Sequence, residues 1–379
     1  MPDLSNGFEK FLNRLDLPLE IEQKIDQVKI IIEEELKNGI EEFSASLKGG
    51  GKSITPKFIL QGSKVYETIN CPCYMPPQQV DVDLGVHLPV SYHENNEEPV
   101  IAALEYFGLV DFILFKVSSK YGWSVDRSKQ TCTRVIINEK IHIDVPLYSM
   151  PDEEFVRFNK SVESKRINKE GTIDNSRFDS QLDWEDFDFK RVLLCMRRGF
   201  WKPSDPRKMA HRFREEIRNQ GDQLKRVWRY LKAWRDFIWR NGGGPSSVYL
   251  MIGALKTFKK CIYRDDLAFL SALKAFETAS TMPVLTTEGE DLKKNQKDEE
   301  LQLLQEKAIF FVSDLQRAIN LPTNNGEAET IVASHLGQRF PIPRNILSNN
   351  PGKSKEDKLE LIQRHNEKFP VGSPHFVNE

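Results

Sequence analysis

Long hydrophobic runs are missing from this chain of 379 residues. No stretch of about 18 apolar residues occurs, so the sequence predicts no transmembrane helix. Residues 1–16 alternate charged and apolar side chains, unlike a signal peptide. Cysteine is scarce as well: the five cysteines include no Cys-x-x-Cys pair, which argues against a disulfide framework and against a zinc site. We therefore expect a cytoplasmic protein with reduced thiols.

An excess of positive charge is missing too. The chain has 54 Lys and Arg against 56 Asp and Glu, a formal net charge of -2. Proteins that coat nucleic acid or an anionic membrane usually carry a basic excess, so we expect no obligate nucleic-acid partner and no membrane partner. The length is sufficient for two lobes, at roughly 100 to 200 residues per domain.

Three aspartates lie on two segments that alternate like β-strands. Asp81 and Asp83 alternate with apolar residues within 80–84, and Asp144 stands in the same kind of pattern within 141–147. Because successive strand side chains point to opposite faces, Asp81 and Asp83 share one face. If the two strands are neighbours, three carboxylates meet, and like charges repel unless a cation neutralises them. The spacing therefore predicts a magnesium site of the kind used in phosphoryl chemistry.

A glycine-serine turn precedes these aspartates. Gly62 and Ser63 follow the apolar residues 58–60, a strand-to-helix corner whose backbone N–H groups and hydroxyl can bind phosphate oxygens. An Asp-x-Asp pair alone is more often the solvent face of a half-exposed strand. The turn, the paired aspartates and the single aspartate together favour a nucleotide site over that simpler interpretation.

In this order, the turn and the aspartates resemble the polymerase-β-type nucleotidyltransferases, which include poly(A) polymerases, oligoadenylate synthetases and cGAS. Further motifs resemble the bacterial cGAS/DncV-like nucleotidyltransferases, and the dinucleotide-cyclase (DncV) branch most closely. These motifs are Gln61-Gly62-Ser63-x-x-Tyr66, Gln79-Val80-Asp81-Val82-Asp83, Gln130-Thr131-Cys132-x-Arg134, His142-Ile143-Asp144, Ser204-Asp205-Pro206, Leu231-Lys232 and Gly244-Pro245-Ser246-Ser247. The resemblance covers residues from about 20 to about 260.

The resemblance implies an α+β fold. Its polymerase-β-like nucleotidyltransferase core would have a mixed β-sheet with flanking helices, and a mostly helical second lobe would follow, with the active site in the cleft between them. We expect the catalytic core with its N-terminal helix in residues 1–187, the helical lobe in 188–340 and a flexible tail in 341–379.

Hydrophobic periodicity places the main elements. Apolar residues recur at three- and four-residue steps within 21–47, which predicts an amphipathic helix, and a helical period also runs through 97–120 and 187–279. Residues 131–145 are typical of a β-hairpin that turns at Asn138-Glu139. The second lobe is therefore expected to be mostly helical.

Basic residues gather between 190 and 240, where Lys and Arg outnumber Asp and Glu by 16 to 5. A solvated helix face would explain such a bias in an arbitrary helix. Because the basic residues flank two turn motifs, we favour a wall that faces the triphosphate of the donor nucleotide. Lys232 would serve there as a point charge and Ser247 as a hydroxyl donor.

The resemblance also implies roles for single residues. The catalytic metal ligands would be Asp81, Asp83 and Asp144, which would hold two magnesium ions, or manganese in their place. The nucleotide-binding residues would be Gln61, Gly62, Ser63, Tyr66, Arg134, Ser204, Asp205, Lys232, Ser246 and Ser247. Tyr66 would offer a stacking face to the acceptor nucleotide, and Asp205 would read a purine base. For His142, a hydrogen bond beneath the site is favoured over ligation, because magnesium prefers oxygen donors.

The implied function is the joining of ATP and GTP into a cyclic dinucleotide such as cyclic GMP-AMP, with release of pyrophosphate, in anti-phage (CBASS) signalling. Two alternatives stay open. A linear-oligonucleotide or RNA-directed transferase would need a long basic groove, and a non-catalytic nucleotide sensor would not need all three aspartates. We expect a monomer, and the resemblance points to ubiquitin-like transfer enzymes as partners of the C-terminus.

Overall fold

The computed structural model describes residues 3–46, 53–89, 103–150, 155–156, 192–286, 289–321 and 325–342. The chain divides into two compact units. The first, here called the α/β unit, is Asp16–Lys225, and the second, the helical unit, combines Met1–Leu15 with Arg226–Glu379. The expected α+β fold, with a mixed sheet in one part and helices in the other, is confirmed. The cleft expected between the lobes stays a prediction.

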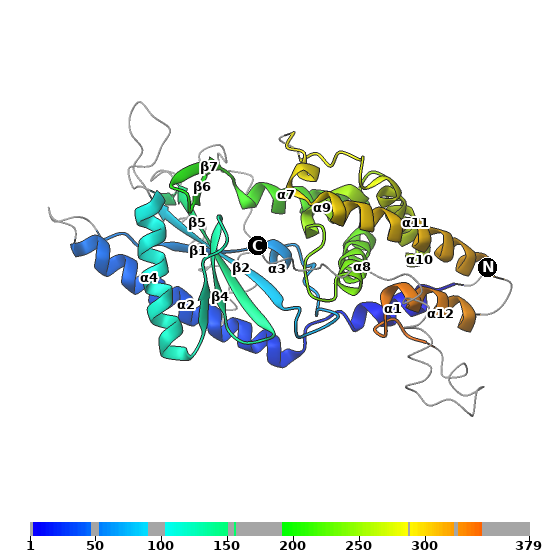
Figure 1. Ribbon diagram of the computed structural model, residues 1–379, viewed down its shortest axis with the longest axis horizontal. Coiled ribbons are helices and arrows are strands. Elements are labelled where there is room, and N and C mark those ends of the chain that lie inside the picture. The colour runs from blue at the N-terminus through cyan, green and yellow to red at the C-terminus, as the bar shows by residue number, and fades with distance from the viewer. Residues whose placement is uncertain are drawn as a thin grey trace, which may run out of the picture. The chain divides into compact units, whose positions relative to one another are not determined.

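The α/β unit is built on a seven-stranded mixed sheet (Figure 1). Its strands are β1 (Lys57–Gln61), β2 (Val80–Pro89), β3 (Ser124–Asp126), β4 (Cys132–Ile136), β5 (Ile141–Met150), β6 (Leu193–Met196) and β7 (Phe200–Pro203). Five of them lie in the order β1-β2-β5-β4-β3, while β6 pairs with β5 and with β7. The central strands β2 and β5 are parallel, and the other pairs are antiparallel. Because β2 and β5 run in the same direction side by side, residues 80–89 and 141–150 lie next to each other although they are far apart in the sequence.

Two long helices, α2 (Leu19–Ser46) and α4 (Ala103–Tyr121), pack together and cover one face of this sheet (Figure 1). On α2, the buried Ile25, Val28 and Ile32 follow three- and four-residue steps and so form one face of the helix. They share a hydrophobic core with Val82 and Ile143 of the sheet. Because strand side chains alternate, the residues next to these two point to the opposite face, away from α2 and α4.

Several expected elements are confirmed. The helix predicted over 21–47 is α2, and the hairpin predicted over 131–145 is the antiparallel pair β4 and β5. The helix predicted over 97–120 is α4, which begins at Ala103 in the described part of the chain.

The helical unit packs around a cluster of aromatic rings. Its helices are α1 (Ser5–Asn13), α8 (Asp222–Ile238), α9 (Ser247–Ala254), α10 (Asp265–Leu273), η3 (Lys274–Thr278), η4 (Leu292–Asn295), α11 (Asp298–Asn320) and α12 (Asn325–Leu336), of which α8 begins in the α/β unit. The Phe8 ring lies 5.0 Å from Tyr230 and 5.4 Å from Phe269, which lies 5.5 Å from Phe311. These contacts bury α1 against helices more than 200 residues away in the sequence.

The boundary between the two parts differs from the expected one. Residues 193–203 form β6 and β7 instead of the predicted helix, and they extend the seven-stranded sheet, so the α/β unit continues to Lys225 rather than ending at 187. A short apolar run such as 192–196 cannot be assigned to strand or helix by periodicity alone. The expected N-terminal helix, α2, lies in the α/β unit, whereas residues 1–15 with α1 belong to the helical unit, because Phe8 and Phe11 pack there.

From residue 343 onward, the tail expected over 341–379 lies outside the described residues. Residues 163–188, a polar and charged stretch for which a long connection is expected, lie outside them as well. Among the helices that the structure describes, all are too short or too polar to cross a lipid bilayer.

Candidate active site

The glycine-serine turn lies where β1 ends and the short helix α3 (Gly62–Val65) begins. Gly62 has φ +63°, in the left-handed region that favours glycine. A Cβ at this position would collide with the Oδ2 atom of Asp83. Glycine is therefore required here twice, for the backbone conformation and for the close approach of a carboxylate to the turn.

Register brings four of the predicted residues into one row across the sheet. Asp83 of β2 pairs with Gln61 of β1 on one side and with Asp144 of β5 on the other, and Asp144 pairs in turn with Arg134 of β4. Side chains directly opposite each other on neighbouring strands have Cβ atoms about 4.5 to 5.5 Å apart. The predicted meeting of carboxylates on neighbouring strands is thus found in the structure.

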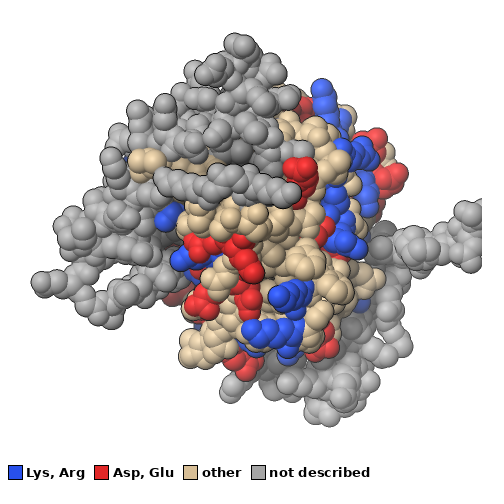
Figure 2. Space-filling model, turned by 90° about the vertical axis from the view of Figure 1, so that its left-hand side faces the viewer, with Lys and Arg blue, Asp and Glu red and all other residues tan. Residues whose placement is uncertain are grey.

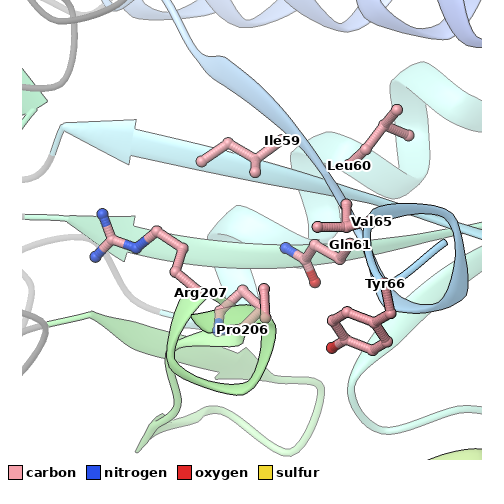
Figure 3. Close-up of a pocket in the computed structure, with 8 residues that line it drawn as sticks. Ile59, Leu60, Gln61, Val65, Tyr66, Pro206 and Arg207 are labelled. Carbon is pink, nitrogen blue, oxygen red and sulfur yellow. The ribbon is translucent and has the colours of Figure 1, made fainter. Parts of the chain in front are cut away.

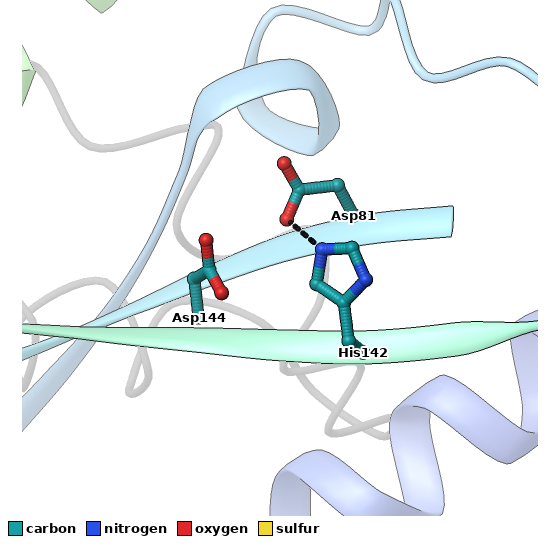
Figure 4. Close-up of side chains that lie close together, drawn as sticks. All are labelled: Asp81, His142 and Asp144. Carbon is teal, nitrogen blue, oxygen red and sulfur yellow. Dashed lines mark hydrogen bonds and ion pairs between the residues drawn. The ribbon is translucent and has the colours of Figure 1, made fainter. Parts of the chain in front are cut away.

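A second row lies two residues earlier on the same face. Asp81 pairs with His142 across β2 and β5, and the His142 Nε2 atom lies 2.7 Å from Asp81 Oδ1 (Figure 4). The other ring nitrogen lies 2.9 Å from Gln79 Oε1. Ligand atoms of Asp81, His142 and Asp144 all lie within 4.8 Å of one another, so these three side chains could hold a metal ion. His142 thus bridges Gln79 and Asp81, in keeping with the expected hydrogen bond.

Two cationic side chains contact the buried carboxylate of Asp144. The Arg134 guanidinium donates from Nε to Oδ1 at 2.6 Å and from Nη2 to Oδ2 at 2.9 Å, a bidentate pair. The Lys129 ammonium donates to Oδ2 at 2.6 Å. Lys129 was not among the predicted site residues. Its only signal in the sequence is its place directly before the Gln130-Thr131-Cys132 motif.

The electrostatics separate Asp83 from Asp81. Burial, together with the neighbouring Asp81 and Asp144 carboxylates, raises the pKa of Asp83 to about 8, although Lys129 and Arg134 oppose the shift. Burial also acts to raise the pKa of Asp81, but the His142 hydrogen bond and the nearby cations outweigh it, so the pKa of Asp81 lies below its usual value. A carboxylate with a raised pKa among other carboxylates is the situation that a bound cation relieves.

Gln61 and Tyr66 line a small pocket behind the turn, together with other residues (Figure 3). The full lining is Ile59, Leu60, Gln61, Val65, Tyr66, Pro206, Arg207 and Ala210. The Gln61 amide oxygen accepts a hydrogen bond from the Tyr148 hydroxyl at 3.0 Å. The Tyr66 ring is buried and meets Phe213 edge-on, with centroids 4.8 Å apart. Tyr66 therefore contributes a wall of this pocket, and its stacking on the acceptor nucleotide stays a prediction.

Ser204 and Asp205 were predicted to read a purine base, but the Asp205 carboxylate is engaged within the protein. Its side chain is 1% exposed and accepts from Arg207 Nη2 at 2.6 Å and from Arg207 Nε at 2.8 Å. It also caps helix α7 (Pro206–Gln220) by accepting from the backbone N–H of Arg207. Asp205 therefore has a structural role, because Oδ1 caps α7 and Oδ2 pairs with the Arg207 guanidinium; its reading of a base stays a prediction.

The remaining predicted residues lie in the helical unit. Lys232 is buried on α8. Ser246 caps α9, since its hydroxyl accepts from the backbone N–H of Tyr249 at 3.2 Å. The Ser247 hydroxyl accepts a hydrogen bond from Arg235 Nη1 at 3.0 Å. Arg235 was not among the predicted site residues. The grouping of these residues with the carboxylates of the α/β unit stays a prediction.

Two protein-family models match the chain. Residues 56–148 match the nucleotidyltransferase domain of the model described as cyclic GMP-AMP synthase DncV-like, and residues 221–350 match the cyclic GMP-AMP synthase C-terminal domain. The chain belongs to the DncV-like nucleotidyltransferases. The expected resemblance to the DncV branch is therefore confirmed, and the first model contains the turn and all three aspartates.

Single relatives agree with this placement. A cyclic GMP-AMP synthase of Vibrio cholerae serotype O1 is 37% identical over 206 residues, which are 52% of this chain and 46% of that protein. One of Escherichia coli is 35% identical over 201 residues, again 52% of this chain and 46% of the relative. The matches thus span about half the length of these curated relatives.

A solved structure shows the same fold. The crystal structure of Vibrio cholerae DncV cyclic AMP-GMP synthase in complex with the linear intermediate 5′ pppA(3′,5′)pG has a TM-score of 0.71 at 23% identity, over 87% of this chain and 93% of that chain. The DncV-like fold therefore extends beyond the regions that the sequence matches cover.

Proposed function

We propose that this DncV-like protein joins ATP and GTP into a cyclic dinucleotide, such as cyclic GMP-AMP, and releases pyrophosphate. The observation that carries the proposal is the placement of Asp83 directly opposite Asp144, with Asp81 on the same face, beside the Gly62 turn. The relatives support it, because the two curated ones are named cyclic GMP-AMP synthases and the related structure holds a linear dinucleotide intermediate.

In this proposal Asp81, Asp83 and Asp144 hold two magnesium ions. The residues fit such ions, since carboxylate oxygens are the donors that magnesium prefers. Ligand atoms of Asp81 and Asp144 lie, with His142, within 4.8 Å of one another, and Asp83 stands directly opposite Asp144 on the neighbouring strand. When bound, the ions supply charge neutralisation for the triphosphate and lower the pKa of the attacking ribose hydroxyl. The raised pKa of Asp83 supports the assignment, because this carboxylate needs a positive partner to ionise among its neighbours.

The protein's own groups orient the carboxylates and the nucleotides. Arg134 fixes both oxygens of Asp144, and His142 fixes one oxygen of Asp81. At the turn, Gly62 lets the Asp83 carboxylate approach the backbone closely, and the Ser63 hydroxyl and neighbouring N–H groups are the proposed contacts for triphosphate oxygens. Lys232 and Ser247 of the helical unit are proposed to bind the remaining phosphate charge.

A linear or RNA-directed transferase is the nearer alternative. Such an enzyme needs an extended basic surface for the nucleic-acid backbone. On the face shown in Figure 2, Lys and Arg of the described part lie beside clustered Asp and Glu. On α2 and α4, Lys120 pairs with Glu35 at 2.8 Å, so positive charge there is locally compensated. We therefore favour ring closure over extension of a long chain.

The product distinguishes the candidates. Purified protein incubated with labelled ATP, labelled GTP and magnesium should yield a phosphatase-resistant dinucleotide. A phosphatase-sensitive product would indicate a linear chain, and no product at all would indicate a nucleotide sensor. Mass spectrometry of the product would also identify the bases.

The wider setting belongs to the same proposal. We place the enzyme in the cytoplasm as a monomer that signals in anti-phage (CBASS) defence, and we propose the C-terminal tail as the site at which ubiquitin-like transfer enzymes act. Deletion of the last residues, followed by an assay of cellular activity, tests the role of the tail: unchanged activity would argue against it.

A further inference from the structure

The loop that joins β3 to β4 is held at both ends. At its start, the Ser128 N–H and hydroxyl donate to the two carboxylate oxygens of Asp126 at 2.8 and 3.1 Å. At its end, Arg197 donates from Nε to the Lys129 carbonyl at 3.1 Å and from its backbone N–H to the Gln130 carbonyl at 2.8 Å. The backbone of Lys129 is therefore fixed beside the carboxylate face.

Arg197 is itself well anchored. Its guanidinium donates to Asp111 Oδ2 at 2.6 Å and to Thr133 Oγ1 at 2.8 Å, and it lies 4.4 Å from the centroid of the Phe107 ring. These partners belong to α4 and β4, both of which carry buried core residues. The clamp thus couples the backbone of the Lys129 loop to the core of the α/β unit, while the Lys129 side chain itself is 40% exposed.

The two cations on Asp144 differ in how tightly they are held. Arg134 makes two contacts with the carboxylate and its side chain is 20% exposed, whereas Lys129 makes one contact and its side chain is 40% exposed. A lysine head is a point charge on a flexible stem, while an arginine fork is rigid and suited to bidentate pairing. Lys129 is therefore the cation that can leave Asp144 without loss of the Arg134 pair.

Lys129 occupies the Oδ2 atom of a carboxylate that we propose as a metal ligand. An ammonium and a divalent cation cannot both lie within contact distance of that oxygen on the same side. Once displaced, the ammonium would remain close to the site, because its backbone is fixed. With Asp81 and Asp83 also engaged by metal in the proposed function, the phosphate oxygens of a bound nucleotide are suitable strong acceptors for the displaced lysine.

We propose that Lys129 is a phosphate-binding residue that exchanges partners: its ammonium pairs with Asp144 until a divalent cation takes Oδ2, and then pairs with the triphosphate of a bound nucleotide. The inference rests on the proposed function and adds to it a coupling between metal binding and nucleotide binding. Metal binding releases the cation that the nucleotide needs, so each ligand favours the other.

The first test is the affinity for Mn²⁺ alone, measured by electron paramagnetic resonance on the full chain without nucleotide. Lys129→Met removes the competing charge, so we expect Mn²⁺ to bind about tenfold more tightly than to the wild type. Lys116→Met is the matched control, because Lys116 is an exposed lysine on α4, the helix that covers the other face of the sheet. It should leave Mn²⁺ affinity unchanged. A merely structural Lys129 would give the opposite sign, since loss of an orienting contact should weaken Mn²⁺ binding.

The second test is the affinity for a nonhydrolysable GTP analogue at saturating Mn²⁺. Lys129→Met should bind it about tenfold more weakly, and Lys129→Arg, which keeps the charge, should restore most of the affinity. Equal or weaker Mn²⁺ binding in Lys129→Met than in Lys116→Met would overturn the exchange, and unchanged analogue affinity would overturn the phosphate contact. If the wild type forms no product from ATP and GTP, the proposed function fails, while the Mn²⁺ titration still decides whether Lys129 competes for Asp144.

Discussion

The α/β unit and the helical unit use their polar residues differently. On the sheet, Asp81, Asp83 and Asp144 stand side by side, and their negative charge is compensated by Lys129, Arg134 and His142. In the helical unit, the Ser246 hydroxyl caps the start of α9, and the Ser247 hydroxyl accepts a hydrogen bond from Arg235. The backbone groups within a sheet pair with one another, so charged side chains can gather on its face without being needed as hydrogen-bond partners. Polar residues at turns before helices are used instead to satisfy the unpaired N–H groups of the helix.

The largest expected effect is on the carboxylate row. Asp144→Asn removes the charge that faces Asp83 across the strands, and we expect product formation to fall on the order of a thousandfold, since a metal contributes several kcal/mol to the transition state. Glu139→Gln is the matched control, because it removes a negative charge from the exposed turn between β4 and β5. Radiolabelled product formation measures both. Comparable losses in the two variants would mean that net charge, rather than this row, matters.

A second prediction concerns the capping aspartate of α7. Because Asp205 and Arg207 are both buried, Asp205→Ala should lower the free energy of unfolding by about 3 to 5 kcal/mol. Urea denaturation measures this, with Ser204→Ala as the control, expected to change stability by less than about 0.5 kcal/mol. If Asp205→Ala kept normal stability and raised the KM for one nucleotide, Asp205 would read a base, and its role would be like that of the carboxylates on the sheet.

The two serines before α9 offer a smaller and sharper contrast. Ser246→Ala should cost about 1 kcal/mol of unfolding free energy through the lost helix cap. Ser247→Ala should change stability little but raise the KM for ATP, if its hydroxyl binds phosphate as proposed. The pair is measured by urea denaturation and by steady-state kinetics. Identical profiles for the two variants would show that the serines do not differ in role.

The last prediction concerns the pH dependence of stability. Because the pKa of Asp83 is raised from 3.8 to about 8 in the folded protein, the native state keeps a proton that the unfolded chain loses above about pH 4. Without divalent ions, stability should fall as pH rises from about 5 to about 8, and Asp83→Asn should flatten this slope. The lowered pKa of Asp81 acts below pH 3.8, outside this window. Melting temperatures across this range test the sign; a slope unaffected by Asp83→Asn would refute it.

Much of the carboxylate site was predictable from the sequence, because strand alternation fixes which side chains share a face. The pairing of Asp83 with Asp144 then needed only that β2 and β5 be neighbours. Lys129 was missed because a loop lysine follows no period, and its position depends on Arg197, far along the chain. Strands β6 and β7 were missed because a four-residue apolar run resembles a helix segment.

Other residues were assigned to nucleotide binding by their motif, and the structure shows that they form hydrogen bonds within the protein. Asp205 and Ser246 stand directly before helices and cap them, so each uses one acceptor within the protein. A motif match thus gives the position of a residue but not its hydrogen-bond partners.

The most direct test compares the wild type with the double variant Asp81→Asn, Asp83→Asn under identical conditions. Both proteins, shown by circular dichroism to be folded, are incubated with ATP, GTP and magnesium, and the products are identified by mass spectrometry after phosphatase treatment. We predict a resistant cyclic dinucleotide from the wild type and none from the variant. A variant that keeps full synthetic output would contradict the claim that these carboxylates are the cation site of nucleotidyl transfer.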